Sequence, residues 1–127
     1  MQKLIFEDAW NRTIAIKDRE RIKEAFNEVT FTTDYSLQVS TLWQATNHKQ
    51  EQLVTVIIHN CSESDAAFQN KKICLTYGGE IVSSRRFTLP EGQIDRKTSM
   101  PWTFIFPSED TQGGPPFDKV NIIVPEH

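Results

Sequence analysis

The feature that most constrains the fold is a pair of adjacent glycines between two segments that read as β-strands. Apolar residues alternate with polar or small ones over residues 72–77, which gives that segment one apolar and one mixed face. Gly78-Gly79 follows, and a second extended segment begins at Ile81. Two glycines can both take positive φ, as the central residues of a tight antiparallel turn require. This stretch therefore predicts a β-hairpin whose returning strand covers residues 81–89.

Short β-branched or aromatic runs separated by turns continue this pattern through most of the chain. The run at residues 53–58 is nearly all apolar and β-branched, which predicts a central strand buried on both faces. Residues 90–101 are expected to form a long connection before an aromatic strand that ends at Pro107. The predicted strands cover residues 36–46, 53–58, 73–77, 81–89, 102–106 and 120–124. We therefore expect a mainly β fold, with an antiparallel Ig-like β-sandwich favoured and a partly open barrel as the alternative.

From residue 18 the apolar residues take the spacing of a helix face, which predicts one N-terminal amphipathic helix over residues 18–28. Asp18 is its expected N-cap, and the apolar positions follow the i, i+3, i+4, i+7 spacing of one helix face, namely Ile22, Ala25, Phe26 and Val29. We expect the helix to cover an end or an edge of the sandwich, with Ile22, Phe26 and Val29 on the core. Before the helix, the apolar runs at residues 4–6 and 14–16 predict extended segments on either side of Trp10.

Composition narrows the class of protein. The chain has 127 residues, of which 38% are hydrophobic and 24% charged, with a formal net charge of −3. It has no repeat and no composition shift, so residues 1–127 are expected to form a single domain. The net charge argues against a nucleic-acid partner, and no apolar run is long enough for membrane insertion. Acidic residues interrupt the N-terminal apolar run where a signal peptide needs continuity, which predicts a cytoplasmic protein with Cys61 and Cys74 as free thiols.

One pair of residues is a candidate for catalytic or metal chemistry. His59 and Cys61 are two residues apart at the end of a predicted strand, so both side chains face the same way and both can bind a metal. A zinc site needs at least one more ligand, and no spaced Cys or His pair supplies it. No nucleophile elbow, phosphate-binding loop or HExxH motif occurs, and most acids fall in polar turns. We therefore predict no metal, no cofactor and no enzymatic activity.

Aromatic residues are the strongest candidates for a binding surface. Trp102, Phe104 and Phe106 share one face of their strand by the period-2 rule, and core packing is the favoured explanation. Trp43 lies on the same alternation as Leu37, Val39 and Ala45, which also favours the core. The functional alternative is an exposed aromatic strip that binds a sugar ring or a partner protein. The candidate interaction surface comprises Trp43, His48, His59 and Trp102.

Several segments of the sequence together resemble one known family. They are Thr-Leu-Trp-Gln-Ala-Thr-Asn at residues 41–47, Leu-Val-Thr-Val-Ile-Ile-His-Asn at 53–60, Phe-Thr-Leu-Pro at 87–90 and Thr-Ser-Met-Pro-Trp-Thr-Phe-Ile-Phe-Pro at 98–107. The chain resembles the SLAP domain family of Bacillus-type Gram-positive bacteria, which is named after an S-layer assembly protein linked to the accessory Sec system. The resemblance covers nearly the whole chain and implies no catalytic residues.

These observations favour a non-enzymatic interaction module with an unknown protein partner. Binding is expected at a free sheet edge by strand addition, or at the loops over residues 47–51, 60–67 and 90–101. The resemblance implies a link to cell-envelope or S-layer assembly. A carbohydrate or small-ligand module that uses exposed tryptophan is the alternative, and an enzyme built around His59 and Cys61 ranks last.

Overall fold

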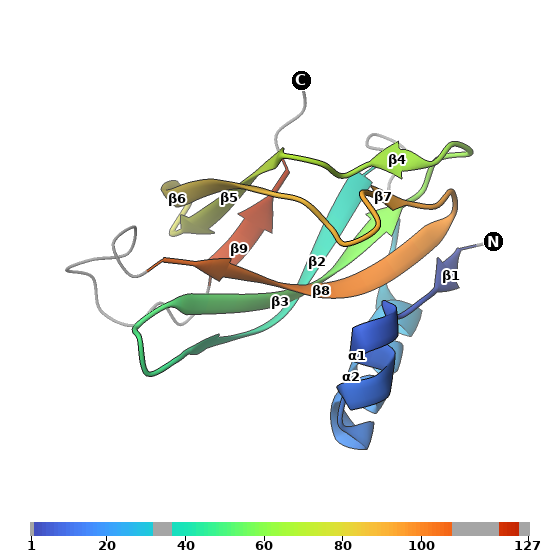
Figure 1. Cartoon of the computed structure of the whole chain (residues 1–127), viewed down its shortest axis with the longest axis horizontal. Coiled ribbons are helices and arrows are strands. Elements are labelled where there is room, and N and C mark those ends of the chain that lie inside the picture. Colours follow the sequence, from blue (N-terminus) through green and yellow to red (C-terminus); the bar gives the residue numbers. More distant parts are fainter. Residues whose placement is uncertain (1, 32–36, 108–119, 125–127) are drawn as a thin grey trace.

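The computed structural model describes residues 2–31, 37–107 and 120–124, and these form a mainly β chain (Figure 1). All six predicted strands are present within one or a few residues of their expected bounds, and three two-residue strands and a second helix join them. In chain order the elements are β1 (Lys3–Leu4), α1 (Asp8–Thr13), α2 (Ile16–Glu28), β2 (Leu37–Thr46), β3 (Gln52–Asn60), β4 (Ala66–Ala67), β5 (Lys71–Tyr77), β6 (Glu80–Phe87), β7 (Gln93–Ile94), β8 (Thr98–Phe106) and β9 (Val120–Ile123).

The strands of the described residues form two main sheets and one small one. The larger sheet has the order β1-β8-β3-β2, the smaller has the order β6-β5-β9, and β4 pairs with β7. All pairs are antiparallel except β1 with β8. β3 lies between β8 and β2, and residues 54–60 are all buried, which confirms the predicted central strand. The Ig-like assignment itself stays a prediction.

One hydrophobic cluster fills the space between the two main sheets. β3 contributes Val54, Val56 and Ile58, and the facing sheet contributes residues of β5 and β9. Phe104 and Phe106 of β8 are fully buried in this cluster, as the period-2 rule predicted. The ring of Phe104 lies 4.8 Å from that of Phe87, centroid to centroid. The aromatic strand therefore anchors the interior.

The glycine hairpin forms as predicted. β5 and β6 pair around it, with Tyr77 opposite Glu80 and a register shift between Leu75 and Thr76. Gly78 and Gly79 have φ of 61° and 85°, the left-handed values that a two-residue turn of this kind needs. The sequence therefore identified both the turn and its conformation.

The N-terminal part differs from the expectation in three ways. Residues 8–13, between the two segments expected to be extended, form the additional helix α1, because the Glu7 carboxylate accepts a hydrogen bond from the Ala9 N–H and caps a first turn. α2 begins at Ile16, with Ala15 at its N-cap position, so Asp18 is not the cap. Phe26 stacks on His59, whose side chain points away from the core, so α2 covers the outer face of the large sheet.

The expected connection over residues 90–101 also proves wrong in part. It contains β7, and β8 begins at Thr98, so that Pro101 lies within a strand. Proline is tolerated there because β1 pairs only with Thr98 and Ser99 of β8, so Pro101 faces a side with no strand partner in the described chain. Across the described residues, no helix combines the length and the hydropathy needed to cross a membrane.

Candidate interaction surface

The outer edge of β8 is the first element of the candidate surface. The N–H groups of Lys3 and Ile5 donate to the carbonyls of Lys97 and Ser99, which shows that the odd-numbered residues of β8 direct their backbone groups away from β3. By the same alternation, the N–H and C=O groups of Thr103 and Ile105 point to that outer side. No described strand pairs with them there. The second half of β8 is therefore open to an added strand.

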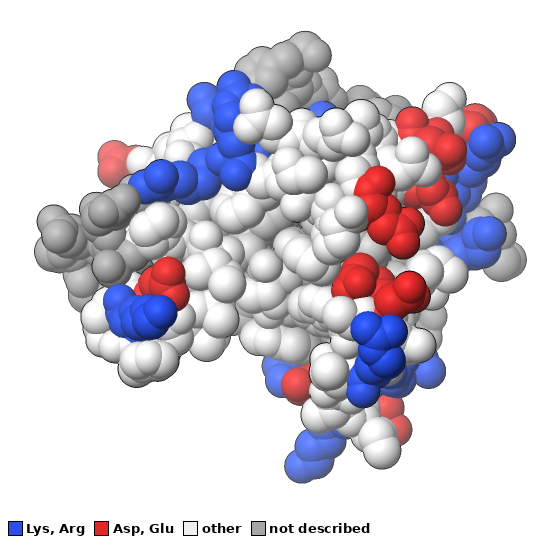
Figure 2. Space-filling view, viewed as in Figure 1, with Lys and Arg blue, Asp and Glu red and all other residues white. Residues whose placement is uncertain are grey.

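The side chains along this edge carry no charge. Residues 100–106 contain no acidic or basic residue, although natural edge strands are commonly guarded by charges. Ile105 is 47% exposed, and the half-buried ring of Trp102 stacks on that of Trp10 at 6.1 Å between centroids. In the view of Figure 2, the middle of the visible face has no charged side chains, and acidic side chains gather to its right. Within the part of the chain that the structure describes, the edge is thus uncharged and unguarded beyond the Trp10 contact.

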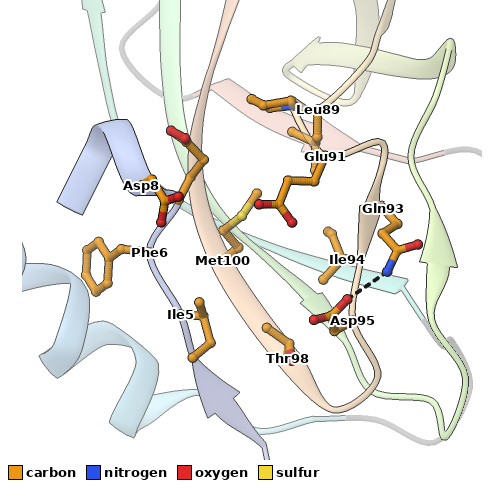
Figure 3. A pocket seen from close by; sticks show the side chains of 12 residues that line it. Ile5, Phe6, Asp8, Leu89, Glu91, Gln93, Ile94, Asp95, Thr98 and Met100 are labelled. Atoms are coloured by element: carbon orange, nitrogen blue, oxygen red, sulfur yellow. Dashed lines mark hydrogen bonds between the residues drawn. The ribbon is translucent and has the colours of Figure 1, made fainter. Parts of the chain in front are cut away.

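An acid-rimmed cleft is the second element, and it opens beside the start of the same strand (Figure 3). Its volume is about 110 Å³. It lies between the segment that links β1 to α1 and the loop around β7. Its lining residues are Ile5, Phe6, Glu7, Asp8, Leu89, Pro90, Glu91, Gln93, Ile94, Asp95, Thr98 and Met100. Four of these twelve are acids and none is basic, so the cleft has an apolar floor and a negative rim.

Gly92 holds the loop that presents Glu91 to the cleft. It has a φ of 71°, its N–H donates to the Leu89 carbonyl, and its own carbonyl accepts from the Phe68 N–H. A Cβ at this position would lie 2.6 Å from the Gln69 side-chain nitrogen. Only glycine takes this backbone conformation freely, so the loop depends on it.

Gly92→Ala is expected to lower the free energy of unfolding by about 1–2 kcal/mol, because alanine resists positive φ. Urea denaturation would measure the change. The double variant Gly92→Ala/Gln69→Ala removes the side-chain clash and leaves the backbone strain, so it should recover only part of the loss. An unchanged urea midpoint in the single variant would contradict this account of the loop.

His59 is fully buried, which corrects its assignment to an exposed surface. Its Nε2 lies 2.9 Å from the Ser40 hydroxyl and its Nδ1 lies 2.6 Å from the Ser99 hydroxyl, which also accepts a hydrogen bond from the Gln2 side-chain amide. Phe26 stacks on the ring and Phe31 meets it edge-on at 5.0 Å. Burial lowers the pKa of His59 to about 4. The ring is therefore neutral at pH 7 and joins the helical layer to the sheet.

The metal or thiol chemistry considered for His59 and Cys61, which ranked last, gains no third ligand among the described residues. In the described part of the chain, no three His, Cys, Asp or Glu side chains gather closely enough to hold a metal ion. Cys61 and Cys74 are both free thiols. Burial raises the pKa of Cys61, an effect that the nearby positive charge of Lys97 opposes. A raised pKa disfavours the reactive thiolate.

Trp43 lies on the outer face of the large sheet and not in the core, contrary to its alternation with Val39. A β-bulge between Thr41 and Trp43 adds one residue to β2, so Thr41 pairs with core-facing Val56 while Trp43 pairs with Thr55. One extra residue moves every later side chain to the opposite face. The half-buried Trp43 ring there receives the guanidinium of Arg21 from α2 at 4.1 Å.

The four predicted surface residues do not form one patch. Trp43 and His59 share the outer face under α2, whereas Trp102 lies at the edge of the core and His48 is exposed in the turn between β2 and β3. The cleft draws on the predicted loop over residues 90–101, but its other wall was missed. A signal for that wall existed, because Glu7-Asp8 places an acidic cap and first turn directly before Trp10.

The fold and the surface together define a small mainly β domain with an unguarded strand edge beside an acidic cleft. A family model described as SLAP domain matches residues 4–125, nearly the whole chain. The chain therefore belongs to the SLAP domain family, as the resemblance indicated. No curated protein and no solved structure matches it.

Proposed function

We propose that this SLAP domain is a non-enzymatic protein-interaction module that acts in S-layer or cell-envelope assembly. The observation that carries the proposal is the outer edge of β8, where the uncharged residues 100–106 pair with β3 on one side and with no described strand on the other. An extended segment of a partner protein would add to this edge, pairing with the backbone of Thr103 and Ile105. The family name supports the link to assembly.

The buried histidine supports the non-enzymatic part of the proposal. Ser40, His59 and Ser99 form a hydrogen-bonded row that resembles a nucleophile, a base and an orienting group. However, two aromatic rings cover the imidazole and its exposed area is zero. A general base must come within hydrogen-bond reach of the proton that it removes. We therefore assign this row a structural role.

Site-specific photo-crosslinking in the native host tests the proposed surface. With p-benzoyl-phenylalanine in place of Ile105, irradiation should give one discrete cross-linked protein. The matched control places the same group at Ile16 of α2, which is also apolar and is 75% exposed. It should give no such product. Equal products from both positions, or none from Ile105, would contradict the proposal, and a product made of two copies of this chain would overturn a separate partner.

We keep two further predictions of the sequence as parts of this proposal, the Ig-like sandwich and the cytoplasmic location. The facing sheets of four and three strands in the described chain support the Ig-like sandwich. The cytoplasmic location stays a prediction that cell fractionation can check.

The alternative function, carbohydrate binding through exposed tryptophan, also stays a prediction. Quenching of tryptophan fluorescence by a panel of sugars would distinguish it from the module proposed here.

A further inference from the structure

We propose that the acid-rimmed cleft receives a lysine or arginine side chain from the partner protein. This inference rests on the proposed interaction function and adds the chemical class of the group that the partner presents. The cleft lies beside Thr98 and Met100, at the start of the strand whose outer edge is open. A partner that adds to that edge would therefore pass close to it.

The floor of the cleft suits the aliphatic stem of a long basic side chain. Leu89 and Ile94 are 1% and 2% exposed, and the half-buried Met100 continues the apolar surface toward the opening (Figure 3). The volume of about 110 Å³ exceeds that of a single water, which takes about 30 Å³ in the liquid. Lysine and arginine bury their methylene stems on such surfaces while the charged head stays at the rim.

The rim supplies the opposite charge. Figure 3 shows the carboxylates of Asp8 and Glu91 on opposite walls above Met100. No ion pair joins either of them to another described residue. The two basic residues nearest in sequence to the cleft loop are engaged elsewhere, since Arg96 pairs with Asp65 and Lys97 with Glu63. Among the described residues, Asp8 and Glu91 therefore have no ion-pair partner, and a partner's cation would complement them.

A side-chain cation fits better than a metal ion. Divalent ions need several carboxylate or carbonyl oxygens within about 2.0–2.6 Å. Among the described residues, no three acidic, Cys or His side chains converge in that way. Two of the rim acids also have local roles, because Glu7 caps α1 and Asp95 accepts from Gln93. Spread carboxylates over an apolar floor match a long cationic side chain.

Methyl NMR titration of the whole chain with short peptides tests the inference. The probes are acetyl-Gly-Lys-Gly-amide and its arginine analogue, and the matched controls carry norleucine or Nε-acetyl-lysine instead. We expect saturable shifts of the Met100, Ile94 and Ile5 methyl signals with the two basic probes only. The double variant Asp8→Asn/Glu91→Gln should weaken binding about ten-fold, since it removes both opposing carboxylates that face the cation. Glu80→Gln, at the distant hairpin, should leave it unchanged.

The outcomes of the titration and of the cross-linking separate the cleft assignment from the proposed function. Shifts of equal size with the norleucine peptide, no shifts with the basic probes, or full binding by the double variant would overturn the lysine or arginine assignment. The proposed function is judged separately by cross-linking at Ile105. If that product forms at the same yield in the double variant, the module stands and only the cleft assignment fails. If the titration succeeds but the Ile105 product is absent, the β8 edge is the part that fails.

Discussion

Replacing Phe104 by alanine is expected to lower the free energy of unfolding by about 3–5 kcal/mol, the usual loss for a buried aromatic ring. The side chain is fully buried, and its ring contacts those of Phe68 and Phe87. Small surrounding shifts cannot refill so large a space, because Phe104 sits where strands of both sheets meet. Urea denaturation followed by tryptophan fluorescence would measure the change.

The neighbouring residue offers a matched control. Ile105 lies on the same strand but is 47% exposed, so Ile105→Ala should lower the free energy of unfolding by less than about 1 kcal/mol. Domains of this size are stable by only about 5–15 kcal/mol, so Phe104→Ala can unfold the chain outright. Phe104→Leu keeps most of the volume and should fold with a smaller loss. Equal losses at positions 104 and 105 would show that Phe104 is not the anchor described above.

Acidification is expected to destabilise the chain through His59. Its folded-state pKa is about 4 and its ordinary value is 6.5, so the unfolded chain binds more protons between these limits. The contribution of His59 to the free energy of unfolding is therefore fully present above about pH 6.5. It falls as the pH drops toward 4, by about 3 kcal/mol at about 1.4 kcal/mol per pKa unit. The physical cause is the loss of hydration that a charged imidazole would suffer between Phe26 and the sheet.

Two measurements isolate this contribution from that of the carboxylates. The imidazole signals of His59 in NMR should titrate near pH 4, whereas a midpoint near 6.5 would refute the buried neutral ring. His59→Gln keeps a polar side chain but cannot titrate, so its free energy of unfolding should change less between pH 7 and 4 than that of the parent. His48→Gln, at an exposed position of the β2–β3 turn, serves as the matched substitution control.

The local patterns of the sequence predicted the elements well wherever residues interact with near neighbours. Gly78-Gly79 specified its own turn, and the β-branched run that became β3 specified a strand buried on both faces. Trp102, Phe104 and Phe106 shared a face as expected. The N-terminal segment was harder, because α1 is one short helix whose first turn depends on the Glu7 cap and whose residues are all outside the core.

The candidate site was less predictable because its parts are distant in sequence. The cleft joins Asp8 to Glu91, and its floor comes from a third segment. The free edge of β8 follows from β1 pairing with only two residues of it, a fact that no local pattern records. Likewise, the bulge before Trp43 reverses a face assignment that simple alternation supports.

By itself the sequence determined that the chain is mainly β, where most strands run, that Phe104 and Phe106 lie in the interior, and which family the chain resembles. The first three depend on alternation, β-branching and glycine, which act over a few residues, whereas the family follows from the resemblance of longer segments. Only the tertiary structure decided that α2 covers the outer face, that His59 is buried between two serines, and that an acidic cleft opens beside a free strand edge. Such features depend on which distant surfaces meet, since hydrophobic burial is non-directional and does not name the partner of each surface.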